Sequence, residues 1–127
     1  MSQPTLTILL VEDDELLMMS FSDMLRDMGH EVFEAPMASV ALACLQDNAN
    51  KIDVLITDIE MPDMNGQELV KLVRAMTPEL PVIYSSGYRA DKIADLASDR
   101  LTRFLEKPFG PAELTETFRS LTVNAAA

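Results

Sequence analysis

Short apolar runs alternate along this chain with longer stretches in which apolar residues recur every three or four positions. Leu6–Val11 is apolar almost throughout, which is typical of a strand buried on both faces of a sheet. Glu31–Ala35 alternates polar and apolar residues, as a strand exposed on one side does. Between these two runs, apolar residues from Leu17 to Met28 recur at helical spacing, which predicts an amphipathic helix.

Continued to the end of the chain, the same pattern predicts five strands and five helices in strict alternation. Strands are expected at 6–11, 31–35, 52–57, 81–85 and 104–106, and helices at 17–28, 37–45, 69–76, 90–97 and 111–121. Alternation of this kind indicates an α/β domain with a parallel sheet. Gly29 and Pro111 support two of the helix ends, because glycine commonly follows a helix and proline suits a first helical turn.

Composition and charge narrow the class of protein. The chain has 127 residues, the length of one domain, and its 10 Lys+Arg against 21 Asp+Glu give a net charge of −11. This acidity argues against binding to nucleic acid or to an anionic membrane surface. The longest apolar runs, Ile8–Val11 and Leu16–Met19, are too short to span a bilayer, and no secretory signal is visible. We therefore predict a cytoplasmic single domain without a nucleic-acid or membrane partner.

Several residues that could carry chemistry are expected to be structural. His30 follows Gly29 at a helix end, which suggests an exposed turn residue rather than a phosphorylated or metal-binding histidine. Cys44 is the only cysteine, so an intramolecular disulfide is excluded, and its apolar neighbours favour a buried thiol over a redox sensor. Four methionines within 18–28 are assigned first to core packing, although Met-rich surfaces also accommodate helical partners.

Residues with reactive side chains follow four of the predicted strands. They are Glu12 and Asp13 after the first strand, Asp58 after the third, Ser86 after the fourth and Lys107 after the fifth. In an open parallel sheet these positions share the carboxyl edge, where ligands bind near the point at which the strand order reverses. Clustered carboxylates at such an edge indicate a hard cation with oxygen ligands, Mg²⁺ or Mn²⁺.

The charges at this edge also point to phosphoryl chemistry. Three ionised carboxylates, Glu12, Asp13 and Asp58, carry −3; a divalent cation brings the site to −1, and Lys107 brings it to zero. A site balanced in this way can accept a phosphoryl group. An aspartate beside Mg²⁺, with a lysine and a hydroxyl group opposite, is suited to attack phosphorus as a nucleophile.

Four blocks of sequence resemble the receiver domain of two-component response regulators. They are Leu9–Asp14 (LLVEDD), Leu55–Gly66 (LITDIEMPDMNG), Pro81–Gly87 (PVIYSSG) and Phe104–Phe109 (FLEKPF). All four occur in order with the family's separations, and the resemblance covers about residues 5–121. It implies a doubly wound, flavodoxin-like (βα)5 three-layer sandwich around a five-stranded parallel sheet. The expected organisation is one receiver domain over 1–127, with short flexible termini and no output domain.

The resemblance also implies a role for each site residue. Asp58 would be the phosphoacceptor, receiving a phosphoryl group from a histidine of a sensor kinase or phosphotransfer protein. Asp13 and Asp58 would bind Mg²⁺ directly, the backbone carbonyl of Glu60 would supply a further oxygen, and Glu12 would hold the metal through water. The Lys107–Pro108 peptide bond is cis in the family, an isomer that only an X-Pro bond adopts at low cost.

A conformational switch is implied as well. Ser86 and Lys107 would contact phosphoryl oxygens, and movement of the loop that carries Ser86 would leave space into which Phe104 could turn. The face made by 90–97, 104–106 and the last helix would then bind a protein target preferentially in one state.

Two site residues depart from the commonest pattern of the family, and two others flank the site. Ser86 replaces the commoner threonine and Phe104 the commoner tyrosine. Glu60 and Tyr88 each lie two residues beyond a site residue, at positions that in the family tune the access of water to the phosphoryl group. Tyr88 could shield that group, whereas Glu60 could repel or orient water.

The function expected from the resemblance is that of a signalling domain that assists its own phosphorylation and dephosphorylation, not of an enzyme with a separate substrate. It would serve as a single-domain regulator, a phosphorelay intermediate or a phosphate sink. Alternatives are the receiver segment of a hybrid histidine kinase, a pseudo-receiver, and a Mg²⁺-dependent phosphatase with an aspartyl nucleophile. Glu60 matches the general acid of such phosphatases, but the chain has no spare length for their substrate cap.

Overall fold

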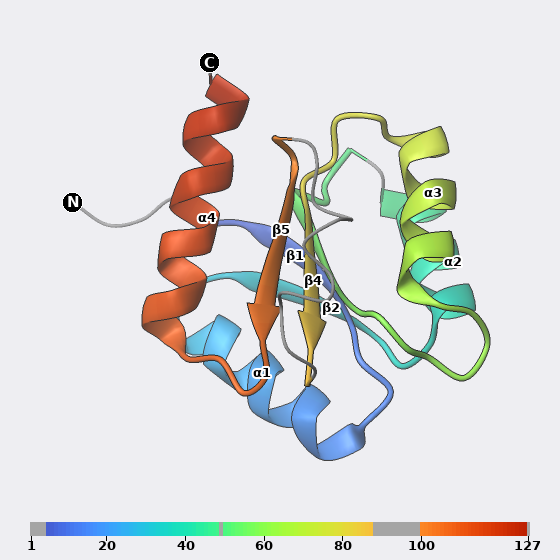
Figure 1. Ribbon diagram of the computed structural model, residues 1–127, viewed down its shortest axis with the longest axis horizontal. Helices are drawn as coiled ribbons and strands as arrows, with labels where there is room; N and C mark the ends of the chain where they lie inside the picture. Colours follow the sequence, from blue (N-terminus) through green and yellow to red (C-terminus); the bar gives the residue numbers. More distant parts are fainter. Residues whose placement is uncertain (1–4, 49, 88–99, 127) are drawn as a thin grey trace.

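A five-stranded parallel sheet with helices on both faces forms the centre of the computed structural model (Figure 1). The structure describes residues 5–48, 50–87 and 100–126. Within them the strands are β1 (Thr7–Val11), β2 (Glu31–Ala35), β3 (Val54–Asp58), β4 (Val82–Ser86) and β5 (Thr102–Glu106), and the helices are α1 (Glu15–Asp27), α2 (Ala38–Asn48), α3 (Gly66–Met76) and α4 (Pro111–Ala126). The strand order is β2-β1-β3-β4-β5, and all neighbouring strands are parallel. The predicted doubly wound architecture is confirmed.

The predicted strands are present, and four of the predicted helices correspond to α1–α4. The helix expected at 90–97 and Tyr88 lie outside the described residues. The last helix continues to Ala126, past its predicted end near residue 121, and α2 continues to Asn48. The predicted helices ended at their last regularly spaced apolar residue. A helix can continue past that residue through polar and small residues, because each further residue adds a backbone hydrogen bond. Within the described ranges, no helix has the length and apolar character needed to cross a membrane.

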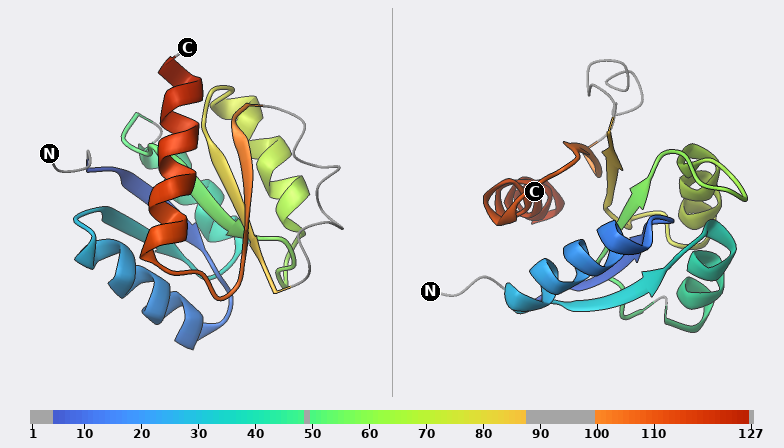
Figure 2. Two further views of the ribbon diagram at one scale, coloured as in Figure 1. Left: turned by 60° about the vertical axis from the view of Figure 1, so that its left-hand side comes forward. Right: turned by 90° about the horizontal axis from the view of Figure 1, so that it is seen from below.

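The two faces of the sheet are covered by two separate cores. Because successive strand residues point to opposite faces, Leu9 of β1 joins one core and Leu10 joins the other. Buried residues of α2 and α3 complete the first core, and those of α1 and α4 complete the second. Figure 2 shows these pairs of helices as layers on either side of the sheet. The continuous apolar sequence of β1 is therefore explained by burial on both faces.

Residues next to α1 determine where this helix begins and ends. The Asp14 side chain accepts hydrogen bonds from the backbone N–H groups of Leu16 and Leu17, and thereby caps the first turn. After the helix, Gly29 adopts φ +97°, a left-handed conformation that glycine reaches without a steric penalty. Asp14 therefore begins the helix beside the carboxyl edge of the sheet, and Gly29 turns the chain back towards β2.

The expectation that His30 is an exposed turn residue is wrong. Its side chain is buried, with 7% of the residue exposed. Its Nδ1 accepts a hydrogen bond from the Leu6 N–H at 3.0 Å, and its ring packs edge-on against Phe118 of α4. The turn ends one residue earlier, at Gly29, so His30 lies between the turn and β2, with its ring against α4. Burial lowers the pKa of the His30 imidazole.

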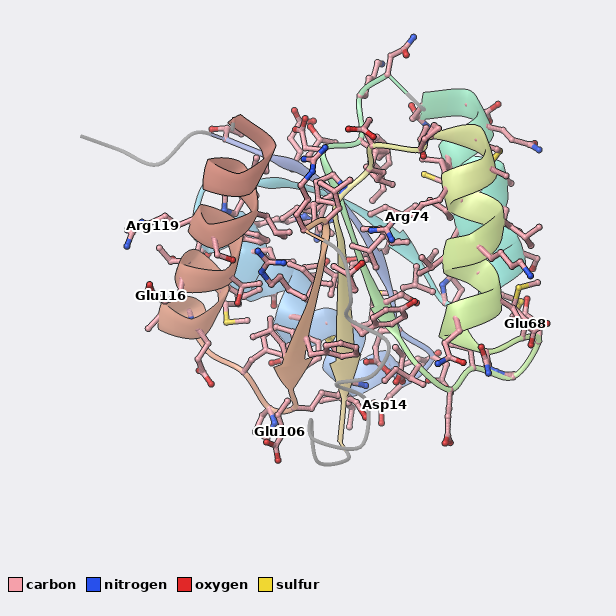
Figure 3. The ribbon with its side chains drawn as sticks, turned by 45° about the horizontal axis from the view of Figure 1, so that its top comes forward. Asp14, Glu68, Arg74, Glu106, Glu116 and Arg119 are labelled. Atoms are coloured by element: carbon pink, nitrogen blue, oxygen red, sulfur yellow. The ribbon has the colours of Figure 1, made fainter. Side chains whose placement is uncertain are left out.

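The strand order reverses at β1, which places a ligand-binding crevice at the carboxyl ends of β1 and β3. Val11 and Thr57 form the last aligned pair of residues between β1 and β3. Glu12 follows β1 directly and Asp58 is the last residue of β3. In Figure 3, Asp14 and Glu106 mark the same edge, to which the strand arrows point. The fold thus brings the candidate residues to one end of the sheet.

Candidate functional site

Three carboxylates meet at the carboxyl edge of the sheet, as the strand ends predict. Glu12, Asp13 and Asp58 each offer a carboxylate oxygen within 4.8 Å of the others. Glu12 is buried, Asp58 is half-buried and Asp13 is exposed. The group therefore runs from the interior of the domain to the solvent, and a ligand can approach it from the side of Asp13.

Lys107 joins two of these carboxylates. Its Nζ lies 2.5 Å from Glu12 Oε1 and 3.0 Å from Asp58 Oδ2, and donates to both. The Lys107 backbone N–H donates to the carbonyl oxygen of Ser86 at 2.7 Å. This bond ties the segment after β5 to the end of β4. A lysine that would otherwise be an ordinary surface residue is thereby held in the site.

The charges of the site are incompletely balanced. Burial raises the pKa of the Glu12 carboxyl, although Lys107 opposes that shift. Burial also acts against the charge of Lys107, but its hydrogen bonds to Glu12 and Asp58 outweigh burial and raise its pKa. The Lys107 side chain therefore keeps its proton and its positive charge. One ammonium group faces three carboxylates, so negative charge remains in excess among these four residues.

The backbone around Asp58 holds its carboxylate in place. Oδ1 accepts the Ile59 N–H at 2.8 Å, while Oδ2 accepts from Lys107. The Thr57 hydroxyl donates to the Asp58 carbonyl oxygen. Gly66, the first residue of α3, packs directly on that carbonyl, and a Cβ at this position would overlap it. Glycine is therefore required at 66 by this close backbone approach.

A pocket of about 620 Å³ opens above Asp58. Its lining includes most of the predicted site residues, and consists of Asp13, Leu17, Asp58, Ile59, Glu60, Ser86, Gly87, Lys107 and Pro108. Ser86 and Lys107 reach it from β4 and from the segment after β5. The pocket is large enough for a phosphoryl group beside Asp58, and Ser86 and Lys107 are among its lining residues.

The donor set fits a hard divalent cation. All three carboxylates offer oxygen, the ligand atom that Mg²⁺ prefers, and the exposure of Asp13 leaves room for water ligands. The excess negative charge around Lys107 gives such an ion a favourable electrostatic environment. The acidic cluster predicted from the sequence is confirmed.

Phe104 lies apart from the pocket, on the sheet face covered by α2 and α3. It stands directly opposite Tyr84 in the ladder between β4 and β5. The two rings stack with centroids 5.2 Å apart and an interplanar angle of 19°. Tyr84 is two residues before Ser86 and therefore on the same face of β4. From the sequence, Tyr84 was assigned only to a strand. The signal that could have identified it was an aromatic residue two positions before Ser86, on the same face of that strand.

The Lys107–Pro108 peptide bond is cis, as the resemblance implied. Cys44 is only partly buried, not fully as expected. It packs against the core beneath α2, and its carbonyl oxygen and Sγ accept from the Asn48 side chain. Burial raises the pKa of the Cys44 thiol, which disfavours the reactive thiolate.

Comparison with models of protein families assigns the chain to a family. The model of the response regulator receiver domain matches residues 8–119. The chain therefore belongs to the response regulator receiver domain family. The resemblance of its four sequence blocks to this family is confirmed.

Curated relatives carry the domain within longer proteins. The sensor kinase CckA of Brucella abortus is 33% identical over 116 residues, which are 91% of this chain and 12% of that protein. The response regulator protein FleR of Pseudomonas aeruginosa is 37% identical over 103 residues, 80% of this chain and 21% of FleR. The chain thus spans only a small part of the length of these relatives.

Solved structures of similar size share the fold. A response regulator receiver domain protein from Clostridium thermocellum has a TM-score of 0.82 at 26% identity, covering 95% of this chain and 94% of its own. The chemotaxis protein CheY4 of Vibrio cholerae has a TM-score of 0.81 at 30% identity, covering 93% and 99%. The receiver domain of the hybrid histidine kinase CckA gives 0.77 at 33% identity, covering 91% and 97%.

Proposed function

We propose that this receiver domain is a phosphorylation switch in which Asp58 accepts a phosphoryl group from a histidine of a sensor kinase or phosphotransfer protein. The observation that carries the proposal is the position of Asp58 between Lys107 and the pocket. One of its oxygens binds Nζ at 3.0 Å, and the side chain still lines the 620 Å³ opening. The carboxylate is thus oriented by the protein and remains accessible to a phosphodonor.

The chemical step needs this chain, the phosphodonor and a divalent cation at the acidic cluster. An Asp58 oxygen attacks phosphorus, the N–P bond of the phosphohistidine breaks, and its electron pair remains on the imidazole nitrogen. Lys107 and the Ser86 hydroxyl stabilise the transferred oxygens, and the Ile59 N–H keeps the carboxylate in place. Bound at this edge, Mg²⁺ supplies positive charge that offsets repulsion between the carboxylate and the phosphoryl group.

In the same proposal, four residues hold the metal. Asp13 and Asp58 bind Mg²⁺ directly, the backbone carbonyl of Glu60 adds an oxygen, and Glu12 acts through water. Glu12 is suited to an indirect role because it lies deepest and is already bound to Lys107. Mn²⁺ can replace Mg²⁺, since both favour oxygen ligands.

The output of the switch is proposed to be a protein contact. Phosphorylation adds charge and three acceptor oxygens beside Ser86. Ser86 moves towards them, and Phe104 leaves its stack on Tyr84 for the space that this movement opens. The face formed by β5 and α4 then changes its affinity for a protein target. A tenfold preference for one state requires about 1.4 kcal/mol of differential binding.

Labelling with a small phosphodonor tests the proposal. With acetyl phosphate and Mg²⁺, the wild-type protein should gain one phosphoryl group per chain, measured by intact mass, and Asp58→Asn should gain none. Omission of Mg²⁺ should abolish wild-type labelling. Undiminished labelling of Asp58→Asn would contradict the role of Asp58. Sustained turnover of a phosphomonoester, instead of stoichiometric labelling, would favour an aspartyl-nucleophile phosphatase.

A second candidate is the receiver segment of a hybrid histidine kinase, favoured by the 33% identity to the sensor kinase CckA over 91% of the chain. The same phosphoryl chemistry on Asp58 would then follow transfer within one polypeptide. The full reading frame distinguishes this candidate from a single-domain regulator acting in the cytoplasm. Phosphotransfer profiling against histidine kinases of the same genome identifies the donor.

A further inference from the structure

The first turn of α2 obtains its cap from a distant part of the chain. The residue before the helix is Met37, whose side chain cannot accept hydrogen bonds from the first N–H groups, and the first turn holds no acidic residue. The carboxylate of Asp63 accepts hydrogen bonds from the first two N–H groups of the helix instead. Its Oδ1 accepts the Ala38 N–H at 3.1 Å and its Oδ2 accepts the Ser39 N–H at 2.9 Å. These hydrogen bonds lower the pKa of the Asp63 carboxyl.

Asp63 belongs to the segment that leaves Asp58. This segment, residues 59–65, lies between β3 and α3 and is closed at its base by the Gly66 N–H, which donates to the Ile59 carbonyl oxygen at 2.6 Å. Its first residue holds Asp58 Oδ1, and Glu60 lines the pocket. The base of the segment is therefore fastened to the site, and its tip is fastened to α2 through Asp63.

We propose that Asp63 is a positioning residue for the Asp58 site. By binding two N–H groups of α2, Asp63 holds the 59–65 segment so that the Ile59 N–H and the Glu60 carbonyl stay aimed at the site. This inference rests on the proposed role of the Glu60 carbonyl as a metal ligand. Loss of groups that support a metal ligand commonly lowers metal affinity about tenfold or more.

A purely structural alternative must be separated from this proposal, because Asp63 also caps a helix. If capping is its whole role, any acid that caps α2 should replace it. Met37 offers the position for such a replacement: it precedes α2, its carbonyl oxygen accepts the Ala41 N–H, and its side chain is 37% exposed. An aspartate at 37 can cap α2 from within the same segment of chain, without contact to 59–65.

The experiment compares Asp63→Ala with the double variant Met37→Asp/Asp63→Ala, which has the wild-type net charge. Three quantities are measured for each: the melting temperature, the Mg²⁺ affinity from an NMR titration, and amide hydrogen exchange of residues 59–61 without Mg²⁺. Asp47→Ala, which removes an exposed acid at the other end of α2, is the matched control. Asp63→Asn keeps one acceptor and serves if the alanine variant does not fold.

Asp63→Ala should lower the melting temperature, weaken Mg²⁺ binding about tenfold and accelerate amide hydrogen exchange at 59–61. The double variant should recover the melting temperature while Mg²⁺ affinity and exchange stay impaired. Recovery of all three quantities would overturn the proposal, as would unchanged Mg²⁺ affinity in Asp63→Ala. A wild-type protein that binds no Mg²⁺ would instead contradict the proposed function, and hydrogen exchange would still test the hold of Asp63 on the segment.

Discussion

At the carboxyl edge of the sheet, three carboxylates lie beside one lysine, whereas at the amino edge two polar side chains, those of His30 and Arg74, bind backbone groups. There, His30 accepts the Leu6 N–H. Arg74, in the last turn of α3, donates to the carbonyl oxygens of Leu101 at 3.0 Å and Leu80 at 3.5 Å. The residues that precede β1, β4 and β5 are thereby tied to the rest of the fold.

The difference between the edges separates stability from function. A buried polar group that binds a backbone partner stabilises the fold and is complete without a ligand. Glu12, Asp13 and Asp58 bring three carboxylates to the ammonium group of Lys107, so negative charge is in excess at the carboxyl edge and a bound cation would stabilise it. Changes at the amino edge should therefore alter stability alone, and changes at the carboxyl edge should also alter ligand chemistry.

Removal of Lys107 tests the carboxyl edge most severely. Lys107→Met keeps the length of the side chain but leaves the carboxylate of Glu12, which is 2% exposed, without its ammonium partner. Loss of one member of a buried ion pair costs about 3 kcal/mol. The free energy of unfolding, measured by urea denaturation with a metal chelator present, should fall by about that amount.

Lys71→Met is the matched control for this variant, because Lys71 is an exposed lysine of α3. Its effect should stay within about 0.5 kcal/mol, as for most surface substitutions. Added Mg²⁺ should restore part of the stability lost in Lys107→Met, since a cation can replace the missing charge beside Glu12 and Asp58. Equal effects of the two lysine variants would show that the carboxyl edge does not depend on this ion pair.

Arg74→Met tests the amino edge. The variant keeps the aliphatic stem but loses the hydrogen bonds to Leu80 and Leu101, each from a charged donor to a backbone carbonyl. Unfolding should become easier by about 1.5 kcal/mol, while labelling by acetyl phosphate should proceed at the wild-type rate. Arg74→Lys, which can still reach one carbonyl, should lose less stability. Loss of labelling in a folded Arg74→Met protein would show that the two edges are coupled.

Much of the fold and the charged site could be predicted because each depends on local pattern. The alternation of strands and helices determines a doubly wound sheet, and the carboxyl ends of parallel strands necessarily meet at one edge. Glu12, Asp58 and Lys107 could therefore be grouped although Lys107 is 95 residues from Glu12 in the chain. No detailed geometry was needed for that step.

The contacts that could not be predicted depend on side chains that meet across the fold. The pairing of Asp63 with α2 joins residues 24 and 25 positions apart, and neither end carries a distinctive local signal. The stack of Tyr84 on Phe104 requires the register of β4 and β5. His30 was predicted to be a turn residue because it follows a glycine. Its burial depends on contacts with Leu6 and Phe118, which only the folded structure shows.

His30 provides the smallest predicted effect, and its sign follows from burial. The folded-state pKa lies below the unfolded value of 6.5, so the unfolded chain binds the proton more readily. Stability is complete above pH 6.5, decreases as the pH falls through that value, and stops decreasing below the folded-state pKa. Each unit by which burial lowers the pKa corresponds to about 1.4 kcal/mol.

His30→Asn keeps an acceptor for the Leu6 N–H but cannot be protonated, so it should lose less stability than the wild-type protein between pH 7.5 and pH 5.5 in urea denaturation. Because the chain has one histidine, its NMR titration reports the folded-state pKa directly. Equal pH dependence of the two proteins would place His30 in solvent and remove it from the amino edge.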